Sequence, residues 1–178
     1  MAKIKKARAA SKAKKVSGPK SYKVSVGDAA PGFSLTSTSG KKETLKDFTG
    51  RYVVLYFYPK DNTPGCTLEG QDFKRLHSAF QKQNCEIVGV SKDSLKSHEG
   101  FKKKFSFPFE LLVDEEGELC GAFDVIQMKK LYGREFMGIE RSTFLINPKG
   151  KIVGEWRKLK VDGHAQSVLD LLKQQNKG

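Results

Sequence analysis

The chain has 178 residues and a formal net charge of +13, with 33 Lys or Arg against 20 Asp or Glu. This length fits one domain with a short extension, and no run of about 18 apolar residues predicts a membrane span. Three cysteines and no apolar leader argue against a disulfide-stabilised secreted domain. A reducing, intracellular setting is expected, with the cytoplasm as the first choice.

The basic charge is concentrated at the start of the chain. Residues 1–23 contain nine basic residues and no acidic one, so they carry +9 and leave +4 for the rest. Their Ala, Ser, Gly and Lys composition predicts a disordered tail before a folded domain over residues 24–178. Such a tail can act as a solvated arm or as a weak nucleic-acid contact. As an address signal, it would place the protein at a nucleoid, a nucleus or an organelle.

The first half of the folded part contains strand and helix patterns in alternation. Phe33–Thr36 alternates as a strand does and is followed by a turn, which predicts a small hairpin. The continuous apolar run Val53–Tyr58 is typical of a central strand covered on both faces. Apolar residues at helical spacing then predict a helix from about Pro64 to Gln83.

The second half continues this alternation and ends in a hairpin and a helix. Its predicted elements are a strand at Glu86–Ser91, a basic helix at 95–105, a strand at Glu110–Val113, an irregular stretch at 121–140, a hairpin of Ser142–Ile146 and Ile152–Trp156, and a helix at His164–Gln174. Strands alternating with helices predict an α/β fold with a mixed sheet flanked by helices.

Cys66 is the candidate reactive thiol, because it stands at the start of a predicted helix. There, unpaired N–H groups and the helix dipole stabilise an anion by roughly 0.3–1 kcal/mol, and the thiolate is the nucleophilic form of cysteine. Further cationic help is needed, which Arg141 can supply if the fold brings it near. Thr63, three residues before Cys66, offers a hydroxyl that can orient a small oxygenated substrate.

The stretch Pro59-x-x-x-Thr63-x-x-Cys66 resembles the active-site motif of the peroxiredoxins, and Arg141 matches the arginine of that family. The segment Pro64 to Glu69 is similar in particular to the bacterioferritin comigratory protein, or Q-type, branch of the AhpC/TSA family. The resemblance runs from about residue 24 to residue 173.

This resemblance implies a thioredoxin-like fold and an antioxidant peroxidase that reduces hydrogen peroxide and organic hydroperoxides without a metal or an organic cofactor. It implies that the Cys66 thiolate attacks the terminal peroxide oxygen and becomes a sulfenic acid. Thr63 and Arg141 would hold the two oxygens, and Pro59 would shield the site from water. Glu69 resembles a residue that hydrogen-bonds around the site; the alternative is a solvated acid in the first helical turn.

The chain departs from its branch at position 71. Many members have a second, resolving cysteine there, whereas this chain has Gln71. The sulfenic acid must therefore be resolved by Cys85, by Cys120 or by an external thiol, such as thioredoxin or a small thiol. The resemblance favours a monomer, and the missing cysteine leaves a dimer open.

Two other functions compete with the peroxidase. The basic tail, residues 1–23, suggests a nucleic-acid-associated protein, and a third alternative is a peroxide sensor or chaperone that uses oxidation of Cys66 as its switch. A zinc site is not expected, because His77, His98 and His164 show no metal-ligand spacing. The three histidines are expected at the surface or on helices.

Overall fold

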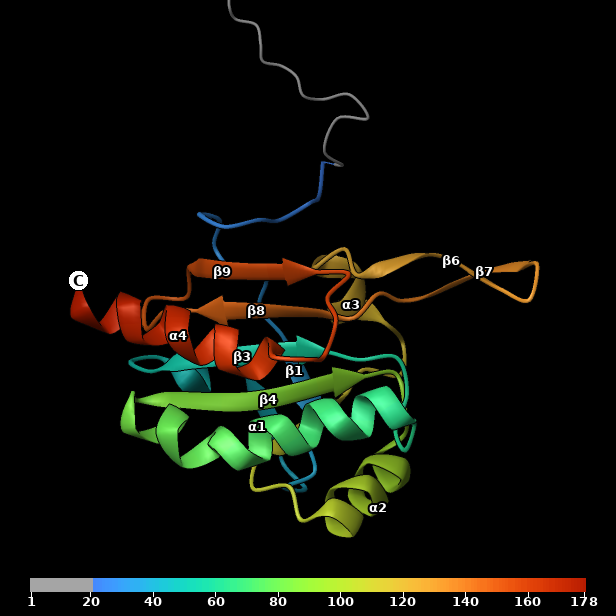
Figure 1. Ribbon diagram of the computed structural model, residues 1–178, viewed down its shortest axis with the longest axis horizontal. Helices are drawn as coiled ribbons and strands as arrows, with labels where there is room; N and C mark the ends of the chain where they lie inside the picture. Colours follow the sequence, from blue (N-terminus) through green and yellow to red (C-terminus); the bar gives the residue numbers. More distant parts are fainter. Residues whose placement is uncertain (1–20) are drawn as a thin grey trace, which may run out of the picture.

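The computed structural model describes residues 21–178 and has a five-stranded mixed sheet at its centre (Figure 1). In spatial order its strands are β5 (Glu110–Val113), β4 (Cys85–Ser91), β3 (Tyr52–Phe57), β8 (Ser142–Ile146) and β9 (Ile152–Arg157). The first three are parallel, while β8 is antiparallel to both β3 and β9. The central place of β3 confirms the strand predicted from its apolar run.

Helices cover both faces of this sheet, which confirms the α/β prediction. Within the described residues the helices are α1 (Pro64–Lys82), α2 (Leu95–Phe105), α3 (Glu118–Ala122), α4 (His164–Lys177) and the short 3-10 helix η2 (Leu45–Phe48). Side chains of α1, α2 and α4 pack together on one face, and those of α3 and η2 pack on the other. Figure 1 shows α1 and α4 side by side in front of the sheet.

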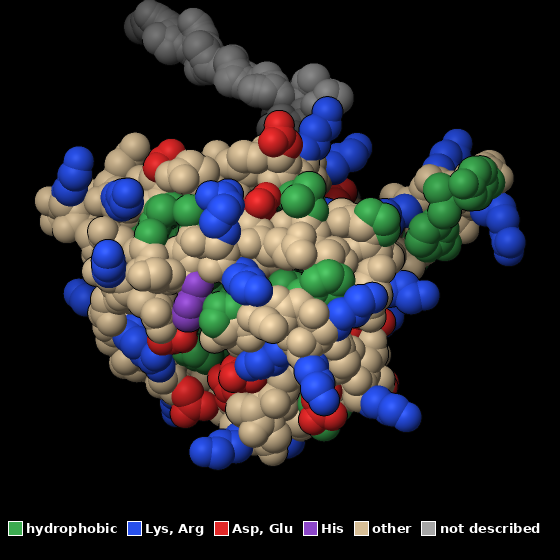
Figure 2. Space-filling view, turned by 60° about the horizontal axis from the view of Figure 1, so that its bottom comes forward, with side chains coloured by type: hydrophobic (Ala, Val, Ile, Leu, Met, Phe, Trp, Pro, Cys, Tyr) green, Lys and Arg blue, Asp and Glu red, His purple; other side chains and the backbone are tan. Residues whose placement is uncertain are grey.

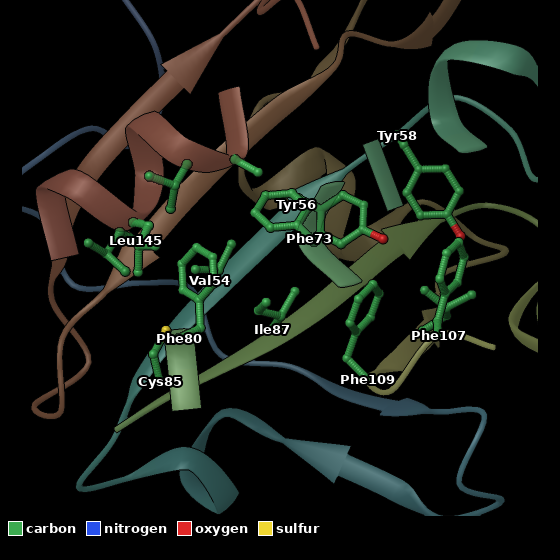
Figure 3. Close-up of a cluster of buried hydrophobic side chains, with 14 of the residues drawn as sticks. Val54, Tyr56, Tyr58, Phe73, Phe80, Cys85, Ile87, Phe107, Phe109 and Leu145 are labelled. Atoms are coloured by element: carbon green, nitrogen blue, oxygen red, sulfur yellow. The ribbon is translucent and has the colours of Figure 1, made fainter. Parts of the chain in front are cut away.

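The strand β3 supplies side chains to two cores, because successive residues of a strand point to opposite faces. Val54 and Tyr56 belong to the core under α1 and α4, and Tyr56 stacks on Phe73 of α1 (Figure 3). Leu55 and Phe57 belong to the core on the other face. Full burial of one such side chain stabilises the fold by roughly 1.5–3 kcal/mol.

Two hairpins complete the described chain. The strands β1 (Ser34–Thr36) and β2 (Lys42–Thr44) pair antiparallel, as predicted. The second hairpin pairs β6 (Ile126–Leu131) with β7 (Arg134–Ile139), so the prediction of an irregular stretch at 121–140 was wrong. Apolar and charged residues are exposed on both faces of this hairpin, which removes the alternation that marks a strand.

The described chain begins with residues that contact the domain. The guanidinium of Arg157 lies 3.8 Å from the ring centroid of Tyr22, and the Lys23 N–H donates to Asp124 at 3.2 Å. These two residues therefore belong with the domain, although the sequence assigned them to the tail. Residues 1–20, with the tail and the nucleic-acid contact predicted for it, lie outside the described residues. Within 21–178, no helix is long and apolar enough to cross a membrane.

The packing of α1 on the rest of the fold predicts opposite effects for two helical glycines. A Cβ on Gly70 of α1 would lie 2.5 Å from the Phe107 ring, whereas a Cβ on Gly100 of α2 would meet nothing within 4 Å. We expect Gly70→Ala to lower the free energy of unfolding by about 1–3 kcal/mol through overpacking. The control Gly100→Ala should raise it by about 0.5–1 kcal/mol. Urea unfolding of both variants measures this, and similar effects of the two changes would contradict the packing.

Candidate active site

The connection from β3 to α1 places Cys66 in the first turn of a helix. Thr63 is the N-cap residue with extended backbone, Pro64 is the first helical residue, and the Thr67 N–H donates to the Thr63 carbonyl at 2.9 Å. Proline suits this first position because its missing N–H would have no helical partner there. Cys66 is 2% exposed, and the open N–H groups of this turn favour a negative charge beside it.

Arg141 reaches Cys66 through the pairing of β3 with β8. Ser142, the first residue of β8, is the register partner of Phe57 at the end of β3. This pairing brings Arg141 to Cys66, which is 75 positions away in the sequence, and Arg141 Nη2 lies 3.4 Å from Cys66 Sγ. The cation that the sequence analysis required is therefore in contact with the thiol.

Gly65 leaves room for this contact. A Cβ at this position would lie 3.0 Å from Arg141 Nη2, a distance tighter than ordinary van der Waals contact. A side chain directly before Cys66 would therefore require the end of the Arg141 side chain to shift by a few tenths of an ångström.

Glu69 holds the other side of the guanidinium. It is 1% exposed, so it is not the solvated first-turn acid that sequence analysis kept as an alternative. Its Oε1 accepts from Arg141 Nη1 at 2.7 Å, while its Oε2 has no hydrogen-bond partner among the described residues. Burial raises the pKa of Glu69 to about 7, against the opposing charge of Arg141. Near neutral pH this side chain therefore exists in both protonation states.

Thr63 and Pro59 lie in the loop before the helix, and both are half-buried. The Thr63 hydroxyl donates to the Lys60 carbonyl at 2.9 Å and does not cap the helix. Its oxygen lone pairs are thus left to accept a hydrogen bond from a substrate. Asn62 in the same loop has a positive φ of 64°, a conformation that asparagine tolerates better than most residues.

A buried hydrogen-bonded cluster, which sequence analysis missed, anchors this loop. The Asp61 carboxylate accepts from the Tyr58 hydroxyl at 2.6 Å and from the Ser97 hydroxyl at 2.8 Å, and it lies 2.8 Å from His98 Nδ1. The other ring nitrogen of His98, Nε2, lies 2.8 Å from the Leu112 carbonyl oxygen. The loop is therefore tied to both α2 and β5.

The surroundings of His98 tie its ring to two other segments of the fold. The residue lies on a helix, as one alternative predicted, but it is fully buried. Each ring nitrogen lies 2.8 Å from an oxygen atom, Nδ1 from Asp61 and Nε2 from the Leu112 carbonyl. Burial opposes the charge on Asp61, but the hydrogen bond and charge of His98 prevail and lower the Asp61 pKa. Asp61 and His98 thus form a buried hydrogen-bonded pair.

Asp93 lies beside this pair, and its carboxylate accepts from the Ser91 hydroxyl at 2.6 Å and the Asp61 N–H at 2.9 Å. Ligand atoms of Asp61, Asp93 and His98 lie within 4.8 Å of one another. Protein donors already engage both carboxylates, so these contacts support a structural cluster and give no reason to assign a metal.

The structure places Cys85 and Cys120 away from Cys66. Cys85 is the register partner of Tyr52, at the far end of β3 from the active-site loop, which is about 16 Å along a strand rising ~3.3 Å per residue. Figure 3 shows Cys85 and Tyr58 at opposite ends of the same core. Cys120 belongs to the core on the other face of the sheet. Burial raises the pKa of both thiols.

A buried thiol in the first turn of a helix, in contact with a guanidinium and preceded by a threonine hydroxyl with lone pairs left to accept, is the arrangement expected of a thiol peroxidase. The chain belongs to the AhpC/TSA family, whose family model matches residues 26–154. Peroxiredoxin Bcp of Bacillus subtilis is 49% identical over 150 residues, which are 84% of this chain and 96% of that protein. Peroxiredoxin Bcp of Xanthomonas campestris is 52% identical over 139 residues, which are 78% and 87% of the two chains.

Solved structures confirm the thioredoxin-like fold and the peroxiredoxin resemblance. Peroxiredoxin Q of Xanthomonas campestris superposes with a TM-score of 0.78 at 50% identity and covers 81% of this chain and 91% of its own. A PrxQ mutant of Xylella fastidiosa gives 0.81 at 46% identity and covers 85% and 96%. The comparisons support the peroxidase and lend nothing to the nucleic-acid-associated alternative. The chain is a peroxidase that acts with a thiol reductant.

The raised pKa of Glu69 predicts how stability depends on pH. The pKa of Glu69 is about 7 in the native protein and has its ordinary value of 4.5 in the unfolded chain. Between about pH 4.5 and 7, the native protein therefore keeps a proton on Glu69 that the unfolded chain has released. Its contribution to stability is therefore complete below the unfolded pKa and is lost as the pH rises through 7. From about pH 5 to pH 8, wild type should lose about 2–3 kcal/mol of unfolding free energy relative to Glu69→Gln. Urea unfolding across this range measures the difference, and parallel pH curves for the two proteins would contradict it.

Proposed function

We propose that Cys66 is the residue that attacks the peroxide. The observation that carries this assignment is the 3.4 Å contact of Arg141 Nη2 with Cys66 Sγ at the start of α1. The thiolate attacks the terminal oxygen of ROOH, a sulfur–oxygen bond forms, and the oxygen–oxygen bond breaks. Cys66 becomes a sulfenic acid, and RO⁻ takes up a proton and leaves as ROH.

The groups around Cys66 have distinct roles in this step. The Arg141 guanidinium stabilises the thiolate and the negative charge that develops on the leaving oxygen. The Thr63 hydroxyl accepts a hydrogen bond from the peroxide and aligns it with the sulfur. Glu69 positions Arg141 through the bond from Nη1, and Pro59 limits the access of water to the loop.

An external thiol completes the cycle. Two cysteines form a disulfide only when their Cα atoms lie within about 7 Å of each other. Cys85 is separated from the active-site end by the length of β3, and Cys120 lies across the sheet. We therefore favour an external thiol over both residues that sequence analysis kept as resolving candidates. That thiol attacks the Cys66 sulfur, releases water and forms a mixed disulfide.

The peroxide substrate, the reductant, the location and the oligomeric state are proposed by similarity to the relatives. The structures solved for the Xanthomonas campestris bacterioferritin comigratory protein address its alkyl peroxide reduction activity. We extend organic hydroperoxides to this chain on that basis, with hydrogen peroxide as a second substrate. We further propose a thioredoxin-type reductant, a cytoplasmic location and a monomer.

Cysteine variants test both the nucleophile and the external thiol. Cys66→Ser should lose peroxide-dependent thiol oxidation and turnover completely. The double variant Cys85→Ser/Cys120→Ser should keep full turnover with thioredoxin or dithiothreitol, because neither thiol enters the cycle. Stopped-flow mixing with peroxide and steady-state assays measure these outcomes. Rapid peroxide reaction in Cys66→Ser would refute the nucleophile, and a large loss of turnover in the double variant would refute external resolution.

A further inference from the structure

The β6–β7 hairpin exposes apolar side chains without packing them on the domain. Figure 1 shows the hairpin projecting from the body, and Figure 2 shows hydrophobic side chains beside Lys and Arg on it. Five of the seven exposed large hydrophobic residues within 21–178 lie on it: Met128, Leu131, Tyr132, Phe136 and Met137. Tyr132, in the turn, is 94% exposed. Met128 and Met137 share one face of the hairpin, and Leu131 and Phe136 share the other. Exposed apolar surface gathered on one projecting element marks an interaction site.

The charges on the hairpin indicate what kind of partner it fits. Lys129, Lys130 and Arg134 stand against the single acidic residue Glu135, so the hairpin carries a net +2. In a two-fold contact, a second copy would place equal positive charges opposite each other. A partner surface with an apolar centre and an acidic rim complements both the exposed apolar side chains and the positive charge of the hairpin.

The hairpin begins and ends beside the active site. Its base is closed by the Glu140 N–H, which donates to the Val125 carbonyl at 2.7 Å, and the next residue is Arg141. Six residues of strand separate this base from the turn, or about 20 Å at ~3.3 Å per residue. A small thiol cannot touch both the turn and Cys66. A globular domain of about 100 residues, with a radius of gyration of ~13 Å, can.

We propose that the β6–β7 hairpin is the docking surface for the protein dithiol that reduces oxidised Cys66, a domain with an apolar contact face and an acidic rim. This inference rests on the proposed function of Cys66 and on its external resolution. Leu68, which is 49% exposed and lies two residues after Cys66, supplies a further apolar contact near the reacting sulfur.

The docked partner carries out a balanced exchange. Its first thiolate attacks the Cys66 sulfenic sulfur, a disulfide bond forms, and hydroxide leaves and is protonated to water. Its second thiolate then attacks the partner's own sulfur in that bond and releases the Cys66 thiolate. The partner's two thiols are oxidised to a disulfide, and Cys66 is reduced.

Kinetics with two reductants test the docking surface. We expect Tyr132→Ser/Phe136→Ser to lower kcat/KM for a net-acidic thioredoxin at least tenfold, because truncation removes central apolar anchors. Its rates with hydrogen peroxide and with dithiothreitol should equal those of wild type. Val26→Ser, an exposed apolar residue outside the hairpin, is the matched control and should change nothing. Lys130→Glu, which removes no apolar packing, should also lower kcat/KM for thioredoxin, most strongly at low salt.

Several results would overturn the docking surface. One is an unchanged kcat/KM for thioredoxin in both hairpin variants. Another is that dithiothreitol reduces the oxidised wild-type protein whereas thioredoxin and glutaredoxin do not. Hairpin-dependent retention on phosphatidylglycerol vesicles with unchanged thioredoxin kinetics would instead assign the surface to lipid. Failure of the proposed function is distinguishable, because Cys66 would then not react with peroxide at all.

Discussion

The contact between Arg141 and Cys66 is the interaction on which the rest of the site depends. Neither residue is close to the other in sequence, and only the antiparallel pairing of β8 with β3 brings the guanidinium to the first turn of α1. The helix contributes partial positive charge through its open N–H groups. Arg141, which directly precedes β8 of the sheet, contributes a full positive charge. The geometry of the proposed catalytic site is thus fixed by the same strand pairing that organises the two cores.

Burial shapes the electrostatics around this contact in two ways. At Glu69 it outweighs the attraction of Arg141 and raises the carboxyl pKa to about 7, so Arg141 is not fully neutralised by its neighbour. At Asp61 the bonds to His98 and two hydroxyls outweigh burial and keep the carboxylate ionised. The first arrangement leaves positive charge available to the sulfur. The second holds the loop that carries Thr63 in one conformation.

Local sequence patterns were sufficient to predict the elements that position the proposed nucleophile. The apolar run of β3 and the Pro64 start of α1 are local features, so the strand, the helix and the place of Cys66 could be read directly. The burial of Glu69 and the pairing of Asp61 with His98 depend on contacts made only in the fold, 37 positions apart in the second case. The β6–β7 hairpin was not predicted because its exposed apolar residues do not alternate with polar ones. The proposed binding of a partner explains why apolar residues are exposed there.

The most direct test of the account is the rate at which peroxide oxidises Cys66 in Arg141→Lys. Lysine keeps the positive charge but lacks the planar fork that contacts both Cys66 and Glu69. Stopped-flow measurement of the second-order rate constant, on protein shown to be folded, should give a value at least about 100-fold below wild type. A rate within about threefold of wild type would contradict the central role of the guanidinium.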